Sequence, residues 1–297
     1  MYDVIIVGGS YAGMAAALQL ARAHRKVFVL DAGQRRNRFA SAAHGILGND
    51  GTPPGEIAAI AKEQLLKYPG LTWQDGKAIS AEKEGAHFTV GTDTHQTLEA
   101  SRLILATGVR DKLPGVPGLQ ERWGQSVFHC PYCHGYELEN GHLGVLATGE
   151  ISMHQALLIP DWGRTTLFTN GAFEPDQNQI EQLKARDVTI EPEEVAEIIG
   201  ERATVKLRSG RLVELAGLFV APEMNVSNPL TEQLGCEYAE GPLGSYIRTD
   251  ETRETTVAGV FACGDVARVA GNVTFAMADG VMAGTAAHRS LIFGGMS

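Results

Sequence analysis

The first thirty or so residues constrain the possible folds of this chain more than any other segment. The run "DVIIVGG" (3–9) is apolar and ends in glycines, which is typical of a buried parallel strand. Small residues recur on a helical period in "YAGMAAALQLARAH" (11–24), and "KVFVLD" (26–31) indicates a second buried strand. The order strand, turn, helix, strand predicts an α/β fold that opens with a β-α-β unit.

The turn after the first strand has glycine where a phosphate-binding turn needs it. Gly8 permits a tight turn and Gly13 is kept, whereas Ser10 replaces the middle glycine of the G-x-G-x-x-G pattern. Small residues such as Ala12 let backbone N–H groups approach a pyrophosphate at the helix N-terminus. Asp31 ends the second strand, where a carboxylate can bind a ribose hydroxyl. We predict dinucleotide binding; the alternative is a glycine turn in an unrelated α/β protein.

Two later segments indicate that the dinucleotide is FAD. "SRLILATGVR" (101–110) is a strand followed by Thr107-Gly108, and "GVFACGDVAR" (259–268) is a strand followed by Gly264-Asp265. They resemble the A-T-G and G-D motifs of the flavoprotein disulfide reductases that have two dinucleotide domains. The resemblance implies that Asp265 binds the ribityl and phosphate region of FAD. It also implies that the next helix points its N-terminus, near Val273 and Thr274, at the flavin.

Because these motifs lie at both ends of the chain, we predict a discontinuous FAD domain at 1–115 and 243–297. The segment 44–56 is too rich in glycine and proline for regular structure, and we expect it over the isoalloxazine. The predicted cofactor contacts are Gly8, Ser10, Ala12, Gly13, Asp31, Arg38, Asn49, Asp50, Ala78, Thr107, Gly108, Gly264, Asp265, Val273 and Thr274.

The middle of the chain has the pattern of a second nucleotide-binding fold. A Pro- and Gly-rich linker at 111–119 is followed by a strand, a turn, a short helix and a strand over 141–171. We therefore predict an inserted domain at 118–240. Two Rossmann-like domains, the second inserted in the first, form the architecture of the thioredoxin reductases, which this pattern resembles.

The turn of the inserted domain, "ATGEIS" (147–152), keeps only the middle glycine of the fingerprint. Glu150 places a carboxylate where a pyrophosphate would lie, which is electrostatically unfavourable, and Pro160 is expected to end the helix early. NADP-binding domains place arginine after the next strand, but no arginine occurs between 165 and 185. We predict that this domain no longer binds a nicotinamide nucleotide; the alternative is a divergent but working NADPH pocket.

The segment "FHCPYCHGYE" (128–137) contains Cys130 and Cys133 with a histidine on each side. The spacing fits a redox dithiol, covalent haem attachment or, with the two histidines, a zinc site. Haem attachment generally follows export, and "MYDVIIVGGSYAG" lacks the basic region of a signal peptide. Adjacent residues rarely bind one zinc ion, and no second C-x-x-C or H-x₃-H completes a tetrahedron. C-P-Y-C also occurs in glutaredoxins, but here it lies between FAD motifs, so we interpret it as a redox dithiol and predict no metal.

Together with "GGSYAG", "DAGQRRNRFA", "NDGTPPGE" and "AAHRSL", the segment "HCPYCHGYE" resembles the thioredoxin-reductase-like flavoproteins. Within them it most resembles the dithiol oxidases of gliotoxin, holomycin and romidepsin. The resemblance implies that Cys133 lies against the flavin and that Cys130 exchanges with the substrate. His134 stands where thioredoxin reductases usually have aspartate. With an ordinary pKa near ~6.5 it could accept a proton from an incoming thiol at neutral pH.

The resemblance implies a homodimeric FAD enzyme that oxidises a small-molecule dithiol to an intramolecular disulfide and passes the electrons to O₂, giving H₂O₂. An NADPH-dependent thioredoxin reductase, a reductase supplied by ferredoxin and a redox-sensing module stay open. A net charge of −10 without a Lys/Arg cluster argues against nucleic acid and anionic membrane partners. No apolar run approaches the ~20 residues of a membrane span. With no export signal, we expect a cytoplasmic enzyme.

Overall fold

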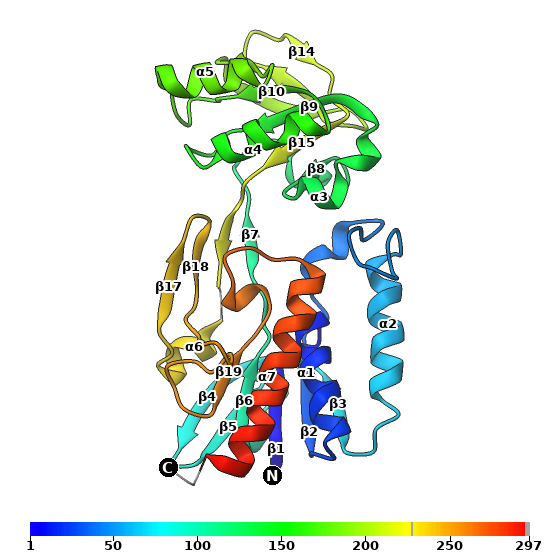
Figure 1. Ribbon diagram of the computed structural model, residues 1–297, viewed down its shortest axis with the longest axis vertical. Helices are drawn as coiled ribbons and strands as arrows, with labels where there is room; N and C mark the ends of the chain where they lie inside the picture. Colours follow the sequence, from blue (N-terminus) through cyan, green and yellow to red (C-terminus); the bar gives the residue numbers. More distant parts are fainter. Residues whose placement is uncertain (227, 295–297) are drawn as a thin grey trace. The chain divides into compact units, whose positions relative to one another are not determined.

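The structure is a computed structural model that describes residues 1–226 and 228–294 (Figure 1). The chain divides into two units. The first unit comprises Met1–Arg38, Gly55–Arg110 and the chain from Met224 onward, and the second comprises Phe39–Pro54 and Asp111–Glu223. This confirms the predicted α/β architecture, in which a second Rossmann-like unit is inserted in the first.

The first unit is built on a sheet in which β3, β2, β1 and β6 are parallel neighbours, and β19 pairs in parallel with the end of β6. Strands β5 and β4 continue the sheet in antiparallel fashion. Val4, Ile5 and Ile6 are fully buried, as expected for a parallel strand covered on both faces. The strands of this sheet are β1 (Tyr2–Val7), β2 (Val27–Asp31), β3 (Leu71–Asp75), β4 (Ala78–Glu84), β5 (His87–Thr92), β6 (Thr97–Leu105) and β19 (Val260–Ala262). Strands β17 (Tyr238–Gly241) and β18 (Gly244–Ile247) form a separate antiparallel pair.

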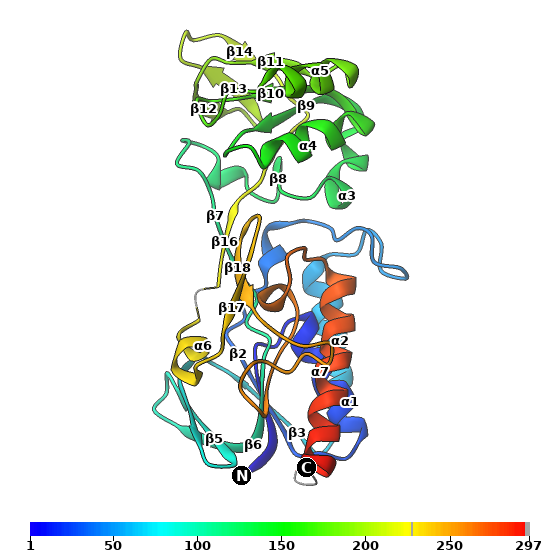
Figure 2. The same ribbon diagram turned by 60° about the vertical axis from the view of Figure 1, so that its left-hand side comes forward.

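Two helices from opposite ends of the chain, α1 (Tyr11–Arg22) and α7 (Val273–Phe293), lie side by side in this unit (Figure 1, Figure 2). A Cβ added at Gly280 would lie 2.1 Å from the Ala12 carbonyl oxygen, and one at Gly284 would lie 2.6 Å from the Ala16 oxygen. Glycine at both positions therefore lets the two backbones touch. The other helices of the unit are η1 (Arg36–Phe39), α2 (Pro54–Leu65), α6 (Pro229–Leu234) and η5 (Asp265–Ala267).

The second unit contains a five-stranded parallel sheet in the order β11-β10-β9-β15-β8 and an antiparallel sheet of β12, β13 and β14. Its strands are β8 (Val127–Phe128), β9 (Asn140–Leu146), β10 (Gly163–Phe168), β11 (Thr189–Glu191), β12 (Val195–Ile199), β13 (Thr204–Leu207), β14 (Leu212–Val213) and β15 (Gly217–Val220). Its helices are η2 (Gln120–Arg122), α3 (Pro131–His134), η3 (Tyr136–Leu138), α4 (Ser152–Leu158), η4 (Ile159–Asp161) and α5 (Gln177–Ala185). The connecting strands β7 (Arg110–Lys112) and β16 (Glu223–Asn225) pair with each other.

The observed change of unit at Arg110–Asp111 lies a few residues before the predicted limits of 115 and 118, and two further limits differ more. Leu230 and Leu234 of α6 and the nearby Cys236 are buried in the same core cluster as Ile5, so the insert ends before 224 and not at 240. The segment Phe39–Pro54 belongs to the second unit, although it lies within the predicted FAD domain. Tertiary packing, which leaves no local signal in the sequence, decides both limits.

Two local expectations, the linker at 111–119 and the irregular segment at 44–56, are corrected in part. The linker predicted at 111–119 begins with the last residues of β7, and the irregular segment predicted at 44–56 ends in α2, because Pro54 suits the first turn of a helix. In the described ranges 1–226 and 228–294, no helix combines the length and apolarity needed to span a bilayer.

Candidate active site

The turn between β1 and α1 is held tightly by its own backbone. Gly8 has a φ of +106°, and a Cβ there would lie 2.2 Å from the Ala106 carbonyl oxygen. A Cβ at Gly13 would lie 1.8 Å from the Gly8 oxygen. The Asp31 carboxylate accepts a hydrogen bond from the Gly9 N–H at 3.0 Å, which fixes the strand end to the turn. The turn has the close backbone approach that a dinucleotide pyrophosphate requires.

The chain just after β6 lies against this turn and carries a hydroxyl group, that of Thr107, without a hydrogen-bond partner in the part of the chain that the structure describes. The Thr107 Oγ1 is buried and has no hydrogen-bond partner among the described residues. Next to it, Gly108 has a φ of +66°, and a Cβ there would meet no atom within 4 Å. Because a buried hydroxyl without a partner costs free energy, a polar group bound in this open space would stabilise the unit. Thr107 and Gly108 therefore fit the FAD that the sequence predicts.

The G-D segment places a carboxylate beside an arginine that the sequence prediction did not select. The Asp265 Oδ2 lies 2.8 Å from the Arg36 Nη1. Arg38, one of the predicted cofactor contacts and the one expected to reach a phosphate of FAD, is exposed and donates a hydrogen bond to the Arg35 carbonyl oxygen at 2.7 Å. The run "RRNR" (35–38) offers three arginines with no sequence signal to choose among them. The phosphate contact of Arg38 stays a prediction.

The other residues of the first unit that are predicted to contact FAD lie at the ends of helices and strands. Val273 and Thr274 begin α7, and the Asn272 side chain caps this helix by accepting a hydrogen bond from the Phe275 N–H at 2.7 Å. Ala78 begins β4. Ser10 is the N-cap of α1 and makes no side-chain capping bond. The N-termini of both long helices thus suit contact with a polar ligand.

Replacing Thr107 with valine tests the assignment of its hydroxyl. Valine keeps the shape of threonine but removes the one buried group of this strand end that has no partner. We expect FAD affinity to fall about fivefold, the loss of one hydrogen bond of ~1 kcal/mol, while the apoprotein is no less stable. Fluorescence titration of apoprotein with FAD measures the affinity. An unchanged affinity would exclude Thr107 from the cofactor site.

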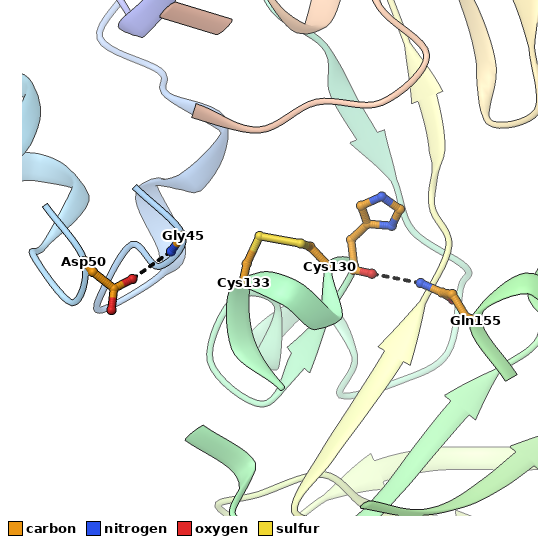
Figure 3. Close-up of a disulfide and its surroundings, with 6 residues drawn as sticks. Gly45, Asp50, Cys130, Cys133 and Gln155 are labelled. Carbon is orange, nitrogen blue, oxygen red and sulfur yellow. Dashed lines mark hydrogen bonds between the residues drawn. A yellow bond between two sulfur atoms is a disulfide. The ribbon is translucent and has the colours of Figure 1, made fainter. Parts of the chain in front are cut away.

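The two cysteines of the second unit form a disulfide, Cys130–Cys133, with their Cα atoms 5.4 Å apart (Figure 3). Cys130 is the N-cap of α3, Cys133 lies within that helix, and both are half-buried. Gln155 of α4 donates a hydrogen bond to the carbonyl oxygen of His129 at 2.8 Å, which fixes the residue before Cys130. The described residues hold no cluster of three or more potential metal ligands. This arrangement can carry out thiol–disulfide exchange.

His134 lies in an apolar environment that the sequence did not reveal. Its imidazole stacks on the Phe128 ring, with 4.3 Å between ring centroids and 18° between ring planes. Burial, together with a smaller effect of the charge on His44, lowers the pKa of His134 to about 4. The expectation of an ordinary pKa near neutrality is therefore wrong. His134 is uncharged at pH 7 and holds a proton only weakly.

The segment 43–52 supplies polar groups to the unit that carries the disulfide. A bridge between Ala43 and Thr52 closes it, and the Asp50 Oδ1 accepts a hydrogen bond from the Gly45 N–H at 2.7 Å (Figure 3). The His44 Nδ1 lies 3.5 Å from the Glu137 Oε1 and 3.7 Å from the Asp50 Oδ1. The structure thus places Asn49 and Asp50 in the second unit, and their role as cofactor contacts stays a prediction.

Sequence reasoning missed His44, Glu137 and Gln155. His44 and Glu137 stand in the two segments that drew attention, but only the fold brings these segments together. No sequence signal marks Gln155, since its partner is a backbone carbonyl group.

The predicted nucleotide turn of the second unit uses part of its backbone amides internally. The Thr148 N–H donates to the Ser152 Oγ at 3.0 Å, and the Thr148 hydroxyl donates to the Ala221 carbonyl oxygen at 3.0 Å. The N–H groups of Ser152 and Met153 donate to the carbonyl oxygens of Gly149 and Glu150. A pyrophosphate that approached the Thr148 or Ser152 amide would compete with these bonds, and the Glu150 carboxylate would repel it. Helix α4 ends at Leu158, just before Pro160, as predicted.

The loop after β10 is likewise occupied by structural contacts. The Asn170 Oδ1 accepts a hydrogen bond from the Val195 N–H at 2.8 Å, and the Glu194 carboxylate lies beside Gly171. Acidic side chains here disfavour the 2′-phosphate of NADP.

A dinucleotide-binding unit interrupted by a second unit with a redox-active pair of cysteines defines a flavoprotein disulfide oxidoreductase. Residues 2–280 match the family described as "Pyridine nucleotide-disulphide oxidoreductase", and the chain belongs to this family. The family binds FAD, which confirms the predicted cofactor.

Similar proteins confirm the resemblance to thioredoxin reductases. The chain is 32% identical to "Thioredoxin reductase tcpT" of Claviceps purpurea, over 98% of this chain and 94% of that protein. Among solved structures, an oxidoreductase from Agrobacterium tumefaciens is 53% identical with a TM-score of 0.96, over 98% of this chain and 99% of that chain. HlmI is 33% identical with a TM-score of 0.92, over 99% of this chain and 94% of that chain.

Proposed function

We propose that this protein is an FAD-dependent dithiol oxidase that closes an intramolecular disulfide in a small dithiol, with O₂ as the electron acceptor. The observation that supports this most is the turn at 147–152. The N–H groups of Thr148 and Ser152 bond within the turn, and the Glu150 carboxylate would repel a phosphate there, so the second unit is poorly suited to NADPH. Electrons must then enter through sulfur.

The chain's own residues account for the exchange steps. A substrate thiolate attacks the Cys130 sulfur, breaks the Cys130–Cys133 bond and releases Cys133 as a thiolate. The second substrate thiol, once deprotonated, attacks the substrate sulfur of this mixed disulfide and releases Cys130. The product is a cyclic disulfide, and its two electrons reside on the cysteine pair. The turn at Gly8–Gly13 and the segment Thr107-Gly108 would hold FAD, which would supply a two-electron acceptor for this dithiol, with O₂ as the final acceptor and H₂O₂ as the product.

An NADPH-dependent disulfide reductase is the second candidate. The family description and the name of the Claviceps relative favour it, because both refer to pyridine-nucleotide or thioredoxin chemistry. It requires a working nucleotide site in the second unit, which the bonds of Thr148 and Ser152 disfavour.

Aerobic turnover without nicotinamide distinguishes the two candidates. We expect the FAD-loaded protein to oxidise dithiothreitol continuously, with one H₂O₂ formed per disulfide. Oxygen uptake, peroxide assay and loss of free thiols measure the reaction. NADPH, added anaerobically, should not bleach the flavin.

The outcome against the oxidase would be rapid anaerobic bleaching by NADPH together with no peroxide from dithiols. Because dithiothreitol serves only as a model substrate, a slow rate would be compatible with the proposal. A yield other than one H₂O₂ per disulfide formed would contradict it. We also propose a homodimer, which sedimentation velocity of the same sample would test.

A further inference from the structure

We propose that Tyr132 and Tyr136 set the substrate specificity of the redox disulfide, by binding the ring of an uncharged aromatic dithiol. The inference deepens the proposed function, because it assumes that a small dithiol opens the Cys130–Cys133 bond. It does not depend on O₂, since the dithiol meets the cysteine pair before any electron reaches the final acceptor.

Both tyrosines are exposed aromatic side chains beside a reactive bond. The exposed fraction is 71% for Tyr132 and 86% for Tyr136. Tyr132 stands between the two cysteines and directly precedes Cys133, and Tyr136 follows Cys133 by three residues. Large aromatic faces that stay in water next to a reactive group are typical of a binding surface.

The helical segment that carries the disulfide places both rings on one side of it. Helix α3 continues into η3 through Gly135, which has a φ of −67° and a ψ of −35° and donates a hydrogen bond to the Pro131 carbonyl oxygen. Tyr132 and Tyr136 are four residues apart, so they are neighbours on the helix surface. With about 3.6 residues per turn, both lie on the same flank of Cys133.

Trp162 supports Tyr132 from outside this helix. The two rings meet edge to face, with 5.1 Å between ring centroids and 88° between ring planes. Trp162 also packs against Gly135, where an added Cβ would lie 2.6 Å from the indole Cδ1. Glycine at this position therefore lets the indole reach the helix between the two tyrosines. A ring that is already held in place loses little further freedom when a ligand stacks on it, which favours binding.

The charged groups on the other flank disfavour an anionic substrate. Glu137 follows the second cysteine by four residues and is its neighbour on the helix surface. The His44 imidazole lies 3.5 Å from the Glu137 carboxylate and 3.7 Å from that of Asp50. Lysine and arginine are absent from both segments that contain these groups, 39–54 and 123–163. Even a protonated His44 would leave this group of three negatively charged, so it repels a dithiol that carries carboxylates.

The test compares three dithiols as reductants of the FAD-loaded protein without oxygen or nicotinamide. Ortho-benzenedimethanethiol is aromatic and uncharged, dithiothreitol is aliphatic and uncharged, and dimercaptosuccinate is anionic. Stopped-flow absorbance gives the initial slope of the flavin bleaching rate against dithiol concentration. Each slope is divided by the rate of the same dithiol with oxidised glutathione, which removes differences in intrinsic thiol reactivity. We expect the aromatic dithiol to have the largest corrected slope and the anionic one the smallest.

Variants assign this preference to the tyrosines. Tyr132→Leu and Tyr136→Leu should each lower the slope for the aromatic dithiol about fivefold more than the slope for dithiothreitol, the effect of losing one aromatic contact. Tyr132→Phe and Tyr136→Phe keep the ring and should keep the preference. Phe293→Leu is the matched control, because Phe293 is an exposed ring at the end of α7 in the first unit, and it should leave the ratio of slopes unchanged.

One further variant tests the charge selectivity. Glu137→Gln should raise the slope for dimercaptosuccinate about threefold relative to dithiothreitol, because one repulsive charge is lost, and added salt should reduce this gain. Glu201→Gln, at an exposed position of the same unit, should not change that ratio.

Equal corrected slopes for the aromatic and aliphatic dithiols would overturn the proposal. A tyrosine-to-leucine loss that is the same for both dithiols, or that the phenylalanine variants share, would also overturn it, because the ring would then not be the contact. If no dithiol bleaches the flavin, the proposed function is lost and this specificity with it. If the preference is as expected but air yields no peroxide, only the oxidase proposal is lost.

Discussion

A protein with Cys133 replaced by serine is expected to bind FAD normally and to lose reduction of the flavin by dithiols. Serine differs from cysteine by one atom, but its hydroxyl forms no disulfide and stores no electrons. The Cys130–Cys133 bond is the only disulfide in the described part of the chain. We expect the rate of anaerobic flavin bleaching by dithiothreitol to fall at least ~10³-fold, in the range found when an essential nucleophile is removed. Stopped-flow absorbance of the flavin measures it.

The matched control is Cys236→Ser. Cys236 is a buried free cysteine of the first unit, close to Thr255 and remote in sequence from the C-x-x-C segment. This variant should bleach at the rate of the parent protein. Cys130→Ser should also lose turnover, but Cys133 should remain as a free thiol. If Cys133→Ser retained a comparable bleaching rate, electrons would have to reach the flavin directly from the substrate, and the cysteine pair would have no redox role.

The oxidised protein is expected to lose stability as the pH falls from about 6.5 to about 4, because of His134. The imidazole has an ordinary pKa of 6.5 in the unfolded chain and about 4 in the folded one. Between these values the unfolded chain binds more protons, so acid favours unfolding and the stability is restored above pH 6.5. The full difference corresponds to about 3 kcal/mol in the free energy of unfolding. Urea denaturation across this pH range measures it.

The glutamine of His134→Gln cannot titrate. Between pH 6.5 and about 4, the free energy of unfolding of this variant should therefore fall by about 3 kcal/mol less than that of the parent protein. Because glutamine also loses the stacking on Phe128, the comparison is between pH slopes and not between absolute stabilities. His95→Asn is the control: His95 is exposed and has a φ of +60°, which asparagine tolerates. Equal pH slopes for His134→Gln and the parent protein would mean that His134 is not shielded from water in solution.

The sequence predicted the α/β architecture because its signals are local. The unit at 3–31 combines apolar runs, a glycine turn and a terminal acid, and the observed β1, α1 and β2 follow them closely. The discontinuous first unit followed from motifs near both ends of the chain, and the degenerate turn at 147–152 was visible as missing glycines.

The features that escaped prediction depend on contacts between distant segments. The sequence around Leu230 and Leu234 would be the same whichever unit these side chains packed into, so the domain limit could not be predicted from the local sequence. His134 stacks on the ring of Phe128, six residues earlier in the chain, and Glu137, one of the two carboxylates beside His44, lies on another segment. Composition gives the residue types of a site, whereas packing decides their protonation.

The order of the elements along the chain constrains how this protein can assemble during synthesis. The sheet of the first unit needs β19, and α1 is covered by α7, yet both come from the last third of the chain. The ribosome has already released all of β8 to β15 when these residues emerge. The inserted unit can therefore complete its own sheet first, while the end of β6, already paired with β1 on one side, lacks β19 on the other. During that interval the nascent first unit exposes an open strand edge and a bare helix face, which are the surfaces that chaperones protect.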